Sequence, residues 1–154
     1  MLFIIISVLC IALDIVSKHI ISSNMFIGES IPLIKNVFHI TYVLNDGAAF
    51  SMLQGKTLFL IIITVAIILA ALIYLFIKKP KDKLLLLSVT LILSGAIGNL
   101  IDRITMGHVV DFLDFRLINF AVFNVADCYV TIGAILLCIY ELKASRNGGD
   151  EDGE

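Results

Sequence analysis

Four long, nearly uncharged apolar runs separate the polar parts of this 154-residue chain, and they limit its possible folds more than any other feature. The runs lie at about residues 2–22, 58–77, 84–101 and 123–142. A helix that crosses the hydrocarbon core of a bilayer needs about 20 predominantly apolar residues. Hydrophobic residues make up 60% of the chain, above the roughly 45–50% that soluble proteins use. The sequence therefore predicts an all-α integral membrane protein with four transmembrane helices in one domain, residues 1–146.

The first run predicts a retained helix rather than a cleaved signal peptide. No basic segment precedes it, and Asp14 and Lys18 lie in its second half. A formal net charge of −2 and the lack of a basic stripe argue against a nucleic-acid partner. Cys10, Cys128 and Cys138 lie inside apolar runs without metal-type spacing, so we expect neither a disulfide framework nor a bound metal.

The short connections between the runs predict the orientation of the chain. The turn at 78–83 is rich in lysine and contains a proline, and Lys143 and Arg146 follow the last run. Because cytoplasmic loops are enriched in Lys and Arg, this turn and the C-terminus are predicted to lie in the cytoplasm. Four spans then place Met1 there as well, and residues 147–154 are predicted to form a disordered acidic cytoplasmic tail.

Both longer connections, 23–57 and 102–122, lie on the outer face in this topology. Residues 31–44 are rich in β-branched and aromatic side chains, which favours one or two strands. Residues 45–47 read Asn-Asp-Gly, a turn signature, and residues 48–53 are suited to a short amphipathic helix on the membrane surface. The sequence thus predicts a small extracytoplasmic platform, about 23–57, over the outer helix ends.

Polar residues that are costly near hydrocarbon collect at those same outer ends. A carboxylate at the centre of a transmembrane helix costs roughly 2.5–3.5 kcal/mol on insertion scales. Six such residues converge on the outer face from three different runs: Asp14, Lys18, Asp102, Arg103, Asn124 and Asp127. This convergence predicts a functional site at one membrane face.

Two carboxylates, Asp111 and Asp127, are the candidates for catalysis. When two carboxyl groups share a site, one stays protonated and the other can act as a base. The alternative is that Asp127 only caps the last helix and that Asp111 is a solvated loop residue. Spacing alone leaves open whether Asp111 or Asp114 faces Asp127.

Asp14 and Lys18, four residues apart on one helix, are predicted to form a structural ion pair, and Asp102 is expected to join such pairing across helices. Asn45 and Asn124 can donate amide hydrogen bonds to a substrate or oxyanion, although each also suits a turn or a helix cap.

Together these motifs resemble the lipoprotein signal peptidase family, also called signal peptidase II, which are bacterial membrane aspartyl proteases. The resemblance spans nearly the whole chain, because the matching blocks occur in the family's order from the first run to the last. The blocks are Asp14–Lys18, Asn45–Phe50, Gly98–Arg103, Gly107–Phe112 and Phe123–Asp127.

The resemblance implies removal of the signal peptide from prolipoproteins just before a diacylglyceryl-modified cysteine, without metal or cofactor. It implies that Asp111 and Asp127, rather than Asp114, are the catalytic pair. It assigns the outer platform to a β-cradle and a short interfacial helix. Residues expected to bind substrate or support the site are Asn45, Gly47, Asn99, Arg103, Asn124 and Ala126.

The resemblance also implies a location and partners. We expect a monomer in the bacterial cytoplasmic membrane that contacts phospholipid, has its active site at the outer face and is inhibited by globomycin. The chain departs from many members in having no tryptophan, and residues 115–123 supply only phenylalanine as aromatic side chains.

Two non-enzymatic classes compete with this interpretation. A small transporter or proton-relay subunit needs ionisable residues near the bilayer midplane of several helices, but the second run has none and the acids lie toward one end. An assembly protein that uses its glycine-containing face would tolerate changes at every acid.

Overall fold

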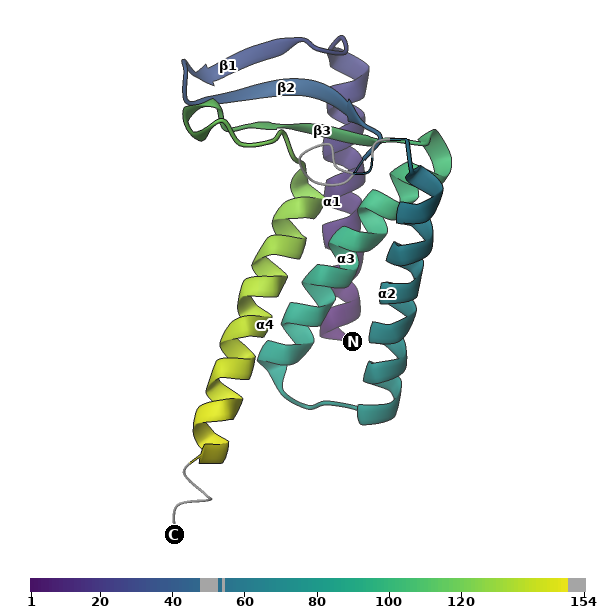
Figure 1. The fold of residues 1–154 in the computed structure, drawn as a ribbon, viewed down its shortest axis with the longest axis vertical. Coiled ribbons are helices and arrows are strands. Elements are labelled where there is room, and N and C mark those ends of the chain that lie inside the picture. The colour runs from purple at the N-terminus through teal and green to yellow at the C-terminus, as the bar shows by residue number, and fades with distance from the viewer. Residues whose placement is uncertain (48–52, 54, 150–154) are drawn as a thin grey trace.

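The computed structural model describes residues 1–47, 53 and 55–149, and these form a bundle of four long helices with a small sheet across one end (Figure 1). All four helices are long and apolar enough to cross a membrane, which confirms the predicted class. Their bounds are Leu2–Asn24 for α1, Thr57–Lys78 for α2, Lys83–Met106 for α3 and Val125–Gly149 for α4.

Helix α3 is the centre of the bundle, because α1, α2 and α4 all pack against it. Glycines make the closest approach possible. A Cβ at Gly95 would collide with the carbonyl oxygen of Ala126 on α4, and a Cβ at Gly98 would lie 2.5 Å from Asp14 Oδ2 on α1. The polar residues of α1, α3 and α4 are therefore brought together near the sheet.

The sheet has three antiparallel strands in the order β1 (Ser30–Ile34), β2 (Phe38–Asn45) and β3 (Val109–Asp114). A small core of Tyr42, Val110 and Phe112 lies beneath it. The sheet extends sideways from the top of the bundle above the end of α4, and α1 rises past β3 and β2 to the level of β1 (Figure 1).

A tight reversal joins α3 to β3. Gly107 has a φ of 81°, a left-handed conformation that favours glycine, and its N–H donates to the carbonyl of Arg103 at 3.1 Å. This cap ends the helix and turns the chain directly into β3. Asp111 is consequently held on a buried strand only four residues after the reversal.

The observed elements differ from the predicted ones in detail. Strand β3 was not predicted, because the second outer connection showed no strand signal as clear as that of residues 31–44. Helix α3 continues to Met106 and so includes Asp102 and Arg103. Helix α4 extends to Gly149, into the segment predicted as a tail. The predicted interfacial helix at 48–53, except Leu53, and residues 150–154 lie outside the described residues.

Candidate active site

Asp111 lies on β3 with only 2% of its surface exposed. Its two carboxylate oxygens accept hydrogen bonds from two asparagine side chains, from Asn45 Nδ2 at 2.8 Å and from Asn124 Nδ2 at 2.6 Å. Burial, with a contribution from the nearby charge of Asp127, raises the pKa of Asp111 to about 7, although the two amide hydrogen bonds oppose the rise. The group is therefore poised to change protonation near neutral pH.

Asp127 lies in the first turn of α4, where a reciprocal cap holds it. The backbone N–H of Asn124 donates to Asp127 Oδ2 at 3.2 Å, and the backbone N–H of Asp127 donates to Asn124 Oδ1 at 3.0 Å. Asn99 Nδ2 on α3 donates to the other carboxylate oxygen at 2.7 Å. Two N–H donors, one from the backbone and one from a side chain, thus fix the orientation of this carboxyl group.

Two asparagines connect the aspartates. Asn124 Nδ2 donates to Asp111 and also to Asn99 Oδ1, at 3.1 Å, so both of its amide hydrogens are used. A continuous chain of hydrogen bonds consequently runs from Asp111 through Asn124 and Asn99 to Asp127. It joins β3, α4 and α3, three elements that are far apart in the sequence.

Both aspartates line one cavity of about 520 Å³. Its polar end is formed by Asp111, Asp127, Asn45, Asn99 and Arg103. The rest of its wall is mainly apolar and comes from Val109, from residues 120–123 before α4 and from residues 128 and 130–132 on α4. A mainly apolar cavity with a few convergent polar groups is typical of a substrate site.

The turn after β2 is tied to α3 by Arg103. Its guanidinium donates to the carbonyl oxygen of Gly47 at 3.0 Å, and the N–H of Gly47 donates to Asn45 Oδ1 at 2.9 Å. The Asn45 side chain is therefore oriented with its carbonyl toward its own turn and its amide nitrogen toward Asp111.

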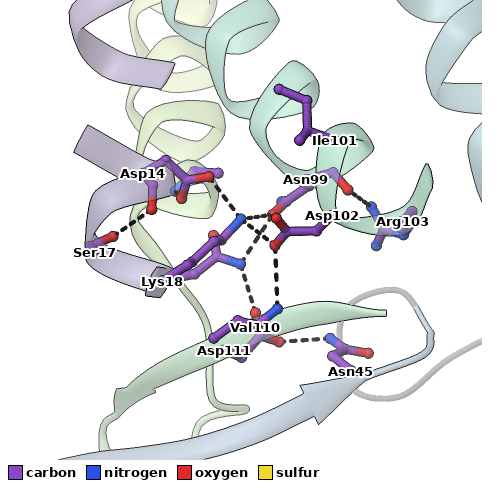
Figure 2. A network of polar contacts seen from close by, with 12 residues as sticks. Asp14, Ser17, Lys18, Asn45, Asn99, Ile101, Asp102, Arg103, Val110 and Asp111 are labelled. Carbon is purple, nitrogen blue, oxygen red and sulfur yellow. Dashed lines mark hydrogen bonds and ion pairs between the residues drawn. The ribbon is translucent and has the colours of Figure 1, made fainter. Parts of the chain in front are cut away.

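A buried ionic cluster of Asp14, Lys18 and Asp102 lies beside Asn99 (Figure 2). Lys18 Nζ lies 2.8 Å from Asp14 Oδ2, 2.9 Å from Asp102 Oδ2 and 2.9 Å from Asn99 Oδ1. Asp14 Oδ1 also accepts the backbone N–H of Ala126 at 2.9 Å. The ion pair with Asp102 therefore connects α1 to α3, and the hydrogen bond to Asp14 connects α1 to the first turn of α4.

Asp102 also receives a hydrogen bond from the sheet. Its Oδ2 accepts the backbone N–H of Val110, on β3, at 3.4 Å (Figure 2). The structure thus brings together all of the predicted site residues, including the three that the sequence suggested as structural ion pairs.

Asp114, the other candidate for the pair, has different partners. Its Oδ2 accepts hydrogen bonds from Thr41 at 2.6 Å and from Arg116 Nε at 2.9 Å. Burial opposes ionisation, but these hydrogen bonds and the charge of Arg116 hold the pKa of Asp114 below its usual range. Asp111 and Asp114 are three residues apart on one strand, so their side chains point to opposite faces.

A shift in register between β2 and β3 allows β2 to place polar side chains on both faces of the sheet. The pairing changes between Ile40 and Val43, so that Val43 is opposite Asp111 and His39 is opposite Asp114. Such a bulge moves alternate side chains from one face of the strand to the other. Thr41 therefore binds Asp114, and Asn45, four residues further along the strand, binds Asp111.

The apolar part of the cavity was not predicted from the sequence. Val130, Thr131 and residues 120–123 line it, and the signal available was only the helical spacing of three and four residues after Asp127. Among the described residues, no group of three or more His, Cys, Asp or Glu side chains is placed to hold a metal ion.

The chain is similar to known membrane peptidases. The family model described as signal peptidase (SPase) II matches residues 6–143. A lipoprotein signal peptidase of Caldanaerobacter subterraneus is 51% identical over 81% of this chain and 85% of its own length. One of Halothermothrix orenii is 49% identical over 94% of this chain and 97% of its own. A solved structure described as a bacterial membrane enzyme matches with a TM-score of 0.89 and 38% identity, over 94% of this chain and 90% of that one.

Proposed function

This chain belongs to the signal peptidase II family, and we propose that it removes the signal peptide of prolipoproteins by aspartyl catalysis at Asp111 and Asp127. The observation that carries this proposal is the pair of buried carboxylates lining one cavity, connected through Asn124 and Asn99. Two carboxyl groups in one such environment can divide the roles of acid and base.

Asp127 is the base and Asp111 is the protonated partner in the resting enzyme. Asp127 accepts hydrogen bonds from two N–H groups, which hold its carboxyl group beside the cavity. Burial raises the pKa of Asp111 to about 7, and an ionised Asp127 nearby adds to this. The pair therefore shares one proton, held on the Asp111 side.

The reaction then follows from these roles. Asp127 accepts a proton from a water molecule as the oxygen of that water attacks the scissile carbonyl carbon. Protonated Asp111 donates a hydrogen bond to the carbonyl oxygen. A tetrahedral intermediate forms, and its C–N bond breaks as Asp127 passes the proton that it took from water to the leaving amine, which returns Asp127 to its starting form. Asn45 and Asn124, which bind the Asp111 carboxyl group, keep it oriented.

The substrate occupies the apolar cavity with its signal helix among the transmembrane helices. The scissile bond lies at the polar end, before a cysteine that carries diacylglycerol, and the acyl chains stay in the lipid. Arg103, which lines the cavity and holds the 45–47 turn, supports the backbone of the substrate or of this turn. A globomycin-type peptide would compete for the same cavity.

In the cell, the protein lies in the bacterial cytoplasmic membrane as a monomer surrounded by phospholipid. Both termini and the lysine-rich 78–83 turn are cytoplasmic, so the sheet and the aspartates lie at the outer face. This orientation matches the side on which a translocated prolipoprotein presents its cleavage site.

The test is cleavage of a purified diacylglyceryl-modified prolipoprotein by the detergent-solubilised protein. Wild type should cut it, and Asp111→Asn and Asp127→Asn should each fold but lose activity. Asp114→Asn, a change of the same kind on the same strand, is the matched control and should still cut. Cleavage by either dyad variant at the wild-type rate would refute the aspartyl assignment even though family membership stands.

A further inference from the structure

Lys18 is a buried cation on α1, with 3% of its surface exposed, and its ammonium group has three hydrogen-bond donors. Three oxygens lie within 2.9 Å of it: Asp14 Oδ2 and Asp102 Oδ2, with which it forms ion pairs, and Asn99 Oδ1, to which it donates a hydrogen bond (Figure 2). Two of these contacts place the positive charge beside buried acids, as the sequence predicts for an ion pair. The third contact is to a neutral amide, and charge neutralisation does not require it.

The third contact determines which way the Asn99 amide points. An ammonium group can only donate, so it requires the oxygen end of the amide. With Oδ1 directed at Lys18, Asn99 Nδ2 is directed at Asp127 Oδ1, 2.7 Å away. A flipped amide would place an oxygen against the carboxylate and remove this hydrogen bond. Asn124 Nδ2, which also donates to Asn99 Oδ1 at 3.1 Å, favours the same orientation.

The charge of Lys18 also acts on the other aspartate. The positive charge lowers the pKa of Asp111, against burial and the charge of Asp127, which raise it. Other charged groups beside the pair, among the residues that the structure describes, are Arg103, which lines the same cavity, and the Asp14 and Asp102 partners of Lys18. Lys18 therefore influences both aspartates without lining the cavity itself.

We propose that Lys18 is a positioning residue for the aspartate pair: through the Asn99 amide it orients the Asp127 carboxylate, and through its charge it sets the pH range in which the pair shares a proton. The inference rests on the proposed aspartyl function and deepens it. It makes α1, which carries neither aspartate, a part of the catalytic apparatus, whereas a structural ion pair would contribute to folding alone.

The first test is a double-mutant cycle between Lys18 and Asn99, with prolipoprotein cleavage as the readout. Lys18→Met removes the charge and the donors at similar volume, and Asn99→Ala removes the amide. We expect Lys18→Met to lower kcat at least about tenfold with KM nearly unchanged. The double variant should be no slower than Asn99→Ala alone, because both changes interrupt one connection. Losses that multiply in the double variant would overturn the proposal.

The second test separates positioning from charge balance. Lys18→Met leaves Asp14 and Asp102 without their cation, whereas Lys18→Met combined with Asp102→Asn restores the net charge of the cluster but not the hydrogen bond to Asn99. We expect this combined variant to regain thermal stability but not kcat. Recovery of wild-type kcat would show that neutralisation alone matters, and failure of both variants to fold would equally assign Lys18 a structural role.

The pH profile supplies the third readout. Without the positive charge, Asp111 ionises less readily, so the basic limb of kcat should move to higher pH in Lys18→Met. An unchanged basic limb would contradict the electrostatic part of the proposal. Failure of the proposed function is recognised separately, because Asp111→Asn or Asp127→Asn would then retain activity whatever the Lys18 variants do.

Discussion

Asn124 Nδ2 lies 2.6 Å from Asp111 Oδ1, and this hydrogen bond joins the strand that carries one aspartate to the cap of the helix that carries the other. The chain closes back on β3 to make the contact. Leu113 and Phe123 exchange backbone hydrogen bonds at 2.8 and 3.1 Å. The segment between them is therefore a loop whose two ends meet at Leu113, on β3. Asn124 follows immediately and is therefore placed beside Asp111.

We predict that Asn124→Ala lowers kcat/KM about 100-fold, in the range seen when one catalytic hydrogen-bond donor is removed. The same change should destabilise the protein by about 1 kcal/mol, because the N-cap of α4 is lost. Asn124→Ser is the matched variant, since serine can still cap the helix but its short side chain does not replace the amide at Asp111. It should recover stability in thermal unfolding without recovering activity, and recovery of both would contradict the proposed bridging role.

The raised pKa of Asp111 predicts how stability depends on pH. An ordinary aspartate in the unfolded chain has a pKa of about 3.9, and that of Asp111 in the folded protein is about 7. The folded state binds the proton more tightly, so this group contributes stability that is fully present below about pH 4 and is lost as pH rises through about 7. Thermal unfolding in detergent should show a shallower decline over this range in Asp111→Asn than in wild type. Equal slopes would show that Asp111 does not titrate as proposed.

Asp114 should behave in the opposite way. Its pKa is held below the usual range by Thr41 and Arg116, so its carboxylate stabilises the folded state above about pH 4 and this stability is lost on acidification. We expect Asp114→Asn to lower the melting temperature at pH 7 and to have little effect at pH 3. A melting-temperature difference that is the same at both values would rule out the ionic contribution.

The close packing of Gly95 against Ala126 predicts that a larger residue at position 95 would disturb the contact between α3 and α4. A Cβ at this position would collide with the Ala126 backbone carbonyl, which cannot move without shifting α4. Gly95→Ala should destabilise the protein by about 1–3 kcal/mol and reduce activity, because α4 carries Asp127. Ala96→Val adds bulk at the next position, which is only half-buried, and serves as the control. Equal melting temperatures for the two variants would contradict the importance of this contact.

Much of the architecture could be predicted because it depends on local sequence. The length of each apolar run predicts a spanning helix, whichever residues it later contacts. The residues 31–44, with their β-branched and aromatic side chains, predict the strands of the platform. The motifs that resemble signal peptidase II predicted the family, and the matching family model and relatives confirm it.

Other features depend on contacts between distant residues and were not predictable from local pattern. Strand β3 forms because β2 pairs with it, and without that strand the sequence gives no reason to place Asp111 and Asp114 on opposite faces. The resemblance implied a role for Asp111. Its two hydrogen-bond donors, Asn45 and Asn124, could be identified only from the structure.

The sequence by itself determined the membrane class, the four helices, the strands within residues 31–44 and the family, because apolar length, β-branched content and ordered motifs are properties of the chain. Only the tertiary structure decided which residues outside its own helix Lys18 contacts. Its spacing from Asp14 predicts a pair within one helix, and that pair exists at 2.8 Å. Its contact with Asn99, 81 positions away, arises because glycines let α3 approach its neighbours closely. A hydrogen bond reaches only about 3 Å, so such a partner is fixed by packing.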